Sequence, residues 1–89
     1  KIHVHWCVAS AVAARAEEAR ASAETFLNGA ARVTMALGDL RDSYFPYQGE
    51  KAKAWVEGQR QLINPDIVLT HRGDDAHQDH RLISELTWN

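Results

Sequence analysis

Two kinds of hydrophobic spacing alternate along this chain, and the alternation limits the folds that it can adopt. Apolar residues recur at every second position in residues 1–10 and again in residues 31–37, which is the spacing of β-strands. They recur at every third or fourth position in residues 15–27 and 50–63, which is the spacing of amphipathic helices. The first two-thirds of the chain therefore predict two strand-helix units in succession.

A third unit is predicted by the remaining sequence. Residues 66–69, Asp-Ile-Val-Leu, form an apolar run without alternation, as expected for a strand buried on both faces of a parallel sheet. A further helix is expected to start near Arg81. Three alternating strand-helix units predict an α/β, Rossmann-like fold with a mainly parallel sheet and functional loops at the carboxyl ends of the strands.

Two local signals separate the predicted elements. Asn28 and Gly29 tolerate the left-handed backbone conformation that often ends a helix. Asn64 and Pro65 are expected to stop the next helix, because proline has no amide hydrogen and restricts the residue before it.

Composition excludes several classes of protein. The 89 residues allow at most one small domain, and a formal net charge of -2 with no run of Lys or Arg argues against nucleic-acid and membrane partners. Residues 1–14 lack the pattern of a signal peptide, so the sequence predicts a cytoplasmic protein. The single cysteine, Cys7, excludes a disulfide framework and is expected to be a buried thiol.

Residues 38–49, GDLRDSYFPYQG, predict a loop too long for a simple turn. Loops of about a dozen residues in compact domains tend to be functional. The alternative is structural: the aromatic residues form a packed plug, and Arg41 with Asp42 forms a solvated cap. The sequence alone leaves both interpretations open.

The strongest concentration of chemistry-bearing residues is Thr70 to His80, THRGDDAHQDH. His77 and His80 are three residues apart, so at the start of a helix both imidazoles can face one side, and Asp79 can reach a ring nitrogen. The pattern suits a metal or acid-base site, although two histidines alone are fewer than the three protein ligands of a catalytic zinc. The alternative is a polar helix start with solvated histidines and an aspartate favoured by the helix dipole.

Residues 64–80, NPDIVLTHRGDDAHQDH, resemble the second signature of the LmbE/PIG-L family of zinc-dependent N-acetylglucosamine deacetylases. The likeness extends over the whole chain, through Arg15-x-x-Glu18, Leu37-Gly38 and Arg41-Asp42-Ser43 in the family's order. Residues 1–89 are thus expected to form part of one deacetylase domain. The family's first signature, which supplies two zinc ligands and the general base, does not occur in these 89 residues, and we expect the family's central first strand to be missing with it.

The resemblance implies a role for each matching residue. His80 corresponds to the third zinc ligand, and His77 to the imidazole that stabilises the oxyanion or protonates the leaving amine. Asp79 is expected to orient and charge-stabilise His77. Arg15 and Asp42 match positions that contact the substrate.

Other positions in the segment are less specific. Gln78 stands where many members have proline, between the functional side chains. The remaining polar residues, His71, Asp74 and Asp75, are expected to shape the loop or to support the side chains that act on the metal and substrate.

The resemblance implies a zinc-dependent amide hydrolase that removes the N-acetyl group of an N-acetylglucosaminyl sugar or glycoconjugate. With two of three zinc ligands absent from the chain, the 89 residues alone are expected to be inactive and to lack tightly bound zinc. The alternative function is a non-catalytic sugar-binding or association module with the same fold. A nucleotide-binding domain is excluded because no Gly-rich phosphate loop follows a strand.

Overall fold

The computed structural model describes residues 2–88 and divides into two compact units, Lys1–Asp39 and Leu40–Asn89. The first unit contains β1 (His3–Val8), α1 (Ala14–Phe26) and β2 (Arg32–Leu37). The second contains the short 3₁₀ helix η1 (Phe45–Gln48), α2 (Gly49–Ile63) and α3 (Gln78–Trp88). The first two predicted strands and all three predicted helices are present, so the α/β class is confirmed.

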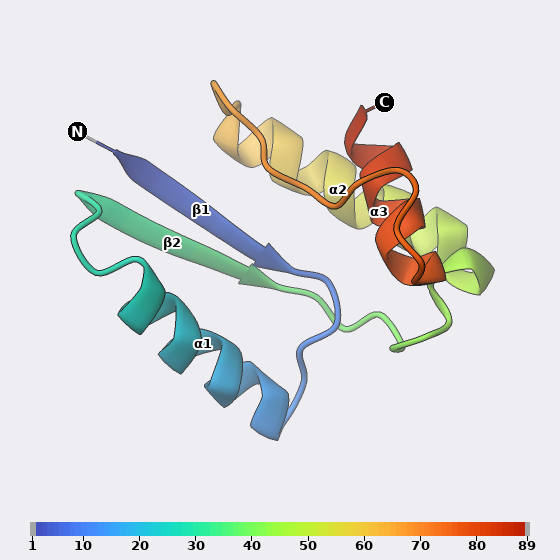
Figure 1. Ribbon diagram of the computed structural model, residues 1–89, viewed down its shortest axis with the longest axis horizontal. Coiled ribbons are helices and arrows are strands. Elements are labelled where there is room, and N and C mark those ends of the chain that lie inside the picture. The colour runs from blue at the N-terminus through green and yellow to red at the C-terminus, as the bar shows by residue number, and fades with distance from the viewer. Residues whose placement is uncertain (1, 89) are drawn as a thin grey trace. The chain divides into compact units, whose positions relative to one another are not determined.

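The first unit is a βαβ arrangement. β1 and β2 pair in parallel, with Val4 opposite Val33 and Val8 opposite Leu37, and α1 runs between them in sequence (Figure 1). A parallel pair requires such a crossover, because a tight hairpin can join only antiparallel strands. The predicted parallel pairing of the first two strands is therefore confirmed.

Helix α1 contacts the sheet through few large side chains. The rings of Trp6 and Phe26 meet edge to face, with their centroids 5.8 Å apart. Among the alanines at helical spacing on this face, Ala23 is buried, whereas Ala16 and Ala19 are partly exposed. Gly29 follows the helix with φ +110°, a conformation that side-chain-bearing residues rarely adopt. The predicted helix end is confirmed, and the apolar face of α1 is only partly buried.

The second unit packs η1, α2 and α3 around a small core. Phe45, Ala52 and Leu86 are its buried apolar side chains on these helices. The Arg60 guanidinium of α2 donates a hydrogen bond of 2.8 Å to the carbonyl oxygen of Thr87, near the C-terminal end of α3. A cation is stabilised there by carbonyl groups that have no partner within the helix. Asn64 ends α2 in the left-handed conformation, directly before Pro65, so the predicted end of this helix is confirmed.

The predicted third strand is wrong for this structure. Residues 66–69 do not form a strand, and Ile67 and Leu69 are 81% and 93% exposed. A strand is held by hydrogen bonds to a neighbour, and within residues 2–88 the sheet contains β1 and β2 alone. The third strand-helix unit therefore retains its helix but lacks its strand.

Cys7 also differs from the prediction, because its thiol is exposed rather than buried. Position 7 alternates with Val4, Trp6 and Val8 along β1, so it lies on the face opposite the Trp6 ring that α1 contacts.

Among the helices described, none combines the length and apolar character needed to cross a membrane.

We expect the 89-residue chain either to self-associate or to be marginally stable, with a low melting temperature. The apolar run at residues 67–69 is exposed, and the two-stranded sheet has outer edges that can accept another strand. Size-exclusion chromatography with light scattering under reducing conditions, followed by a thermal melt, measures both properties. Leu69→Lys should reduce association more than the control Val12→Lys, which changes an exposed apolar residue outside the run. A monomer with a cooperative, high-temperature transition would contradict this expectation.

Candidate active site on helix α3

The loop that enters α3 is folded by a side chain of the helix itself. The Arg81 guanidinium donates two hydrogen bonds of 2.8 Å, to the backbone carbonyl oxygens of Asp75 and Ala76. Backbone carbonyls in a loop have no ladder or helix partner, so a side-chain donor that satisfies two of them restricts the loop strongly. The histidine segment is therefore held against the helix that follows it.

His77 begins the helix by capping it. Its Nδ1 accepts a hydrogen bond from the backbone N–H of Asp79, at 3.1 Å, and its carbonyl accepts one from Arg81. A side-chain acceptor just before a helix satisfies an amide that would otherwise lack an intrahelical partner. The helix consequently starts at Gln78, three residues before the predicted start.

Asp79 is buried, with 2% of its surface exposed, and both of its carboxylate oxygens are used. One accepts the backbone N–H of Ser43, at 2.5 Å, and the other that of Phe45, at 3.0 Å. Ser43 has φ 70°, a conformation unfavourable for a residue with a side chain, and its carbonyl accepts from Gln78 at 2.6 Å. Asp79 and Gln78 together fix the loop before η1 to the first turn of α3.

The carboxylate of Asp79 also lies near the ring of His77. The distance from His77 Nδ1 to Asp79 Oδ2 is 4.0 Å, which permits a charge interaction if the ring is protonated but is too long for a hydrogen bond. Asp42 joins these two residues: one potential ligand atom from each of the three lies within 4.8 Å of the others. The structure thus brings Asp42, His77 and Asp79 together.

His80 is fixed by different partners. Its Nδ1 lies 3.1 Å from Oδ1 of Asp75. One face of the ring stacks with His71 at a centroid distance of 4.1 Å, and the ring also stacks with His77 at 4.8 Å. Three imidazoles from the predicted segment therefore form one stacked group.

Neighbouring groups shift two pKa values in this cluster. Partial burial, followed by the nearby His80, lowers the pKa of His71 below its ordinary value. The backbone N–H of His77, together with the hydrogen bond from His80, lowers the pKa of Asp75. At neutral pH Asp75 is therefore an ionised hydrogen-bond acceptor.

Arg15 belongs to the other unit of the structure. It is an exposed residue of α1, in the first unit, whereas the six residues of the cluster, Asp42, His71, Asp75, His77, Asp79 and His80, belong to the second unit. Its predicted contact with the substrate stays a prediction.

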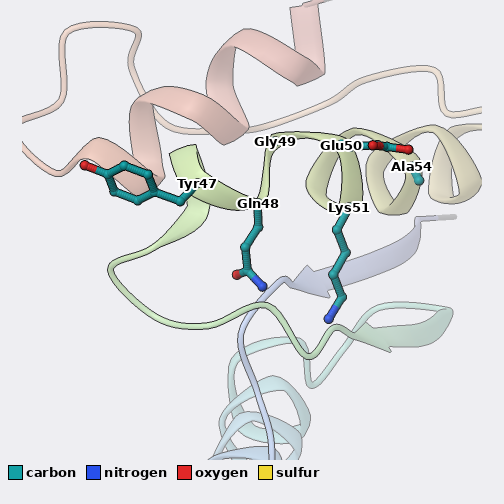
Figure 2. A pocket seen from close by; sticks show the side chains of 6 residues that line it. All are labelled: Tyr47, Gln48, Gly49, Glu50, Lys51 and Ala54. Atoms are coloured by element: carbon teal, nitrogen blue, oxygen red, sulfur yellow. The ribbon is translucent and has the colours of Figure 1, made fainter.

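The aromatic segment after the cluster is only partly a packed plug. Phe45 is buried, but Tyr44 and Tyr47 are exposed, and the Arg41 guanidinium lies 3.8 Å from the centre of the Tyr44 ring. An open pocket lies farther along, at the start of α2, where Gln48 and Lys51 extend in the same direction (Figure 2). No predicted site residue lines this pocket, so the histidine cluster is the better candidate for chemistry.

Several residues that build the site could not be identified as such from the sequence. Arg81 and Gln78 are adjacent to the histidines, and a polar side chain in the first helical turn was the only signal for them. The backbone amides of Ser43 and Phe45 come from more than 30 residues earlier in the chain, and no sequence signal indicates that a buried carboxylate binds them.

The fold and the cluster together define a class: an α/β chain that concentrates imidazoles and carboxylates at the start of a helix, as metal-dependent and acid-base hydrolases do. A family model described as PIG-L, GlcNAc-PI de-N-acetylase, matches residues 2–89. The chain belongs to this family. A search of curated proteins found no match, and neither did a search of solved structures.

One ring nitrogen of His80 remains available to a metal ion, although His80 is not among the three grouped potential ligands, Asp42, His77 and Asp79. Histidines that bind metal usually donate their second ring N–H to a carboxylate, which fixes the ring and raises its basicity. Asp75 occupies that position at Nδ1, so Nε2 is the nitrogen that would hold zinc. His77 differs, because its Nδ1 already accepts the Asp79 amide.

Proposed function

We propose that this chain supplies one part of the active site of a zinc-dependent deacetylase, which hydrolyses the N-acetyl group of an N-acetylglucosaminyl sugar or glycoconjugate. The family match supports the class of reaction. The observation that carries the proposal is that His77, Asp79 and His80 occupy one short stretch at the start of α3, each fixed by its own partners. Residues 1–89 then form part of one deacetylase domain.

Zinc, when bound, would polarise the acetamide carbonyl and lower the pKa of its bound water toward about 7. Among the residues of this chain, His80 would hold it. The first signature, with two further ligands and the general base, is expected in a longer polypeptide, here called the two-signature protein. The 89-residue chain alone is then inactive.

His77 is suited to act on the substrate as a hydrogen-bond donor. Because Nδ1 accepts the Asp79 amide, the neutral ring carries its proton on Nε2. That N–H can donate a hydrogen bond to the carbonyl oxygen as negative charge develops there. Delivery of a proton to the leaving amine requires the imidazolium form, which returns to the neutral ring when the proton leaves. If the ring becomes protonated, the carboxylate of Asp79 at 4.0 Å stabilises the charge.

Asp42 and Arg15 are proposed to contact the substrate. Asp42 supports this role by its position beside His77 and Asp79, where its carboxylate can accept hydrogen bonds from sugar hydroxyl groups. For Arg15 the support is the family pattern alone, since its helix belongs to the other unit.

We expect the two-signature protein to contain one equivalent of zinc, and the 89-residue chain to lose zinc during chelator washing. One histidine ligand cannot retain zinc tightly, because catalytic sites usually take three protein ligands. Metal analysis after gel filtration measures both, and hydrolysis of an N-acetylglucosaminyl substrate should stop on chelation and return with zinc. One equivalent retained by the short chain would overturn the assignment of ligands.

A non-catalytic association or sugar-binding module is the alternative. It predicts that the two-signature protein binds the same sugar without releasing acetate. Measuring binding beside hydrolysis separates the two functions.

A further inference from the structure

The carboxylate of Asp75 makes two contacts with the residues that carry the proposed chemistry. Its Oδ1 atom accepts the backbone N–H of His77, at 2.8 Å, and lies 3.1 Å from Nδ1 of His80. A single oxygen atom therefore links the residue expected to act on the substrate to the residue expected to bind zinc.

The chemistry of the two groups decides which one donates. An ionised carboxylate can only accept hydrogen bonds, so the Nδ1 atom of His80 must carry the proton that joins them. A neutral imidazole has one N–H and one lone pair, which leaves the lone pair on Nε2. The contact with Asp75 thus selects the tautomer that can bind a metal through Nε2.

The stacked rings restrict the remaining freedom of His80. Its plane is within 10° of that of His71 and within 21° of that of His77. The stacking sets the plane of the ring, and Asp75 sets which edge faces the carboxylate. Rotation of the ring by half a turn would lose the hydrogen bond.

We infer that Asp75 is a positioning residue, which holds His80 in the Nδ1–H tautomer with Nε2 directed toward the metal. The inference rests on the proposed function for the identity of the ligand, but the control of the tautomer stands on the geometry of the second unit alone.

The neighbouring aspartate provides a matched control. Asp74 pairs with Arg72 at 3.0 Å, and both side chains are largely exposed, at 72% and 85%. Asp74→Asn removes the same charge one residue away without touching either histidine.

The test uses the two-signature protein labelled with ¹⁵N-histidine. With zinc removed, NMR of the imidazole nitrogens should show His80 protonated on Nδ1 in the wild type and in Asp74→Asn. Asp75→Ala should populate both tautomers of His80. Asp75→Asn is the second variant: because one oxygen makes both contacts, its amide oxygen can accept the His77 N–H and the His80 Nδ1–H, so the loop and the Nδ1–H tautomer should be retained while the negative charge is lost.

Zinc affinity, measured by competition with a chelator, is the second readout. Loss of such an outer partner typically lowers metal affinity by about 10–100-fold, and we expect this for Asp75→Ala, with a smaller loss in Asp75→Asn, a partial restoration in Asp75→Glu and no change in Asp74→Asn. An unchanged tautomer in Asp75→Ala would overturn the inference, as would an altered tautomer with unchanged zinc affinity. If the wild type binds no zinc, the proposed function fails, whereas the tautomer measurement still decides whether Asp75 controls His80.

Discussion

Replacing His80 with alanine is expected to remove zinc and hydrolysis together from the two-signature protein. His80 presents Nε2 as the nitrogen available for metal, because Asp75 engages Nδ1. No other described side chain in the stacked group has a carboxylate within hydrogen-bond distance of its ring. The variant should therefore contain far less than one equivalent of zinc after gel filtration, with hydrolysis at background.

Replacing His77 with alanine should separate the two properties. Its Nδ1 caps α3 through the Asp79 amide, and its Nε2–H is free to act on the carbonyl oxygen rather than on the ion. Removing such a donor typically lowers kcat by about 10²–10³-fold, and zinc should remain bound. The matched control is His3→Ala, which removes an exposed histidine of the first unit.

The measurement is zinc content beside kcat and KM for each variant. Equal loss of zinc from His77→Ala and His80→Ala would mean that His77 is a ligand and that its assigned role is wrong. Because alanine also removes the helix cap, His77→Asn is a useful second variant: its amide oxygen can cap the helix but cannot transfer a proton.

Asp79→Ala is expected to destabilise the chain by about 2–4 kcal/mol, since it leaves one buried and one partly buried donor without a partner, and a fully buried donor costs about 1–3 kcal/mol. The two donors are the amides of Ser43 and Phe45, and Phe45 is part of the buried core. Asp79→Asn keeps one accepting oxygen and should lose about half as much.

Chemical denaturation followed by far-UV circular dichroism measures this loss. Asp74→Ala is the control, because an exposed ion pair such as that with Arg72 contributes about 0–1 kcal/mol. A loss from Asp79→Ala no larger than that of the control would contradict the structural role assigned to Asp79.

The elements that could be predicted are those determined by local sequence. The helices follow from the spacing of their apolar residues, and Gly29 and Asn64 end the first two because their backbone adopts positive φ. The parallel pairing of β1 and β2 follows from the helix between them.

The third strand could not be decided locally. Residues 66–69 have the composition of a buried strand, but a strand exists only when another strand satisfies its backbone groups. Within the described residues no such partner pairs with them, and the run has no regular secondary structure and is exposed. Composition indicates that a segment can form a strand, and hydrogen bonding to a neighbouring strand decides whether the strand forms.

The candidate site was predicted as a group of residues rather than as a set of contacts. The three-residue spacing of His77 and His80 predicted that both lie at the start of a helix and face one side. In the structure their rings stack there. Asp79 was expected to orient and charge-stabilise His77. Its shortest contacts, however, are with two backbone amides from a loop that lies far away in the sequence. Such contacts depend on tertiary folding, so the spacing of side chains in the sequence cannot indicate them.

Product analysis tests the central claim most directly. The two-signature protein, loaded with zinc, is incubated with an N-acetylglucosaminyl glycoconjugate, and acetate and free amine are quantified over time. The proposed deacetylase releases both in equal amounts, at a rate abolished by chelation and by His80→Ala. Binding of the sugar by zinc-loaded protein without release of acetate would contradict the proposal and establish the non-catalytic alternative.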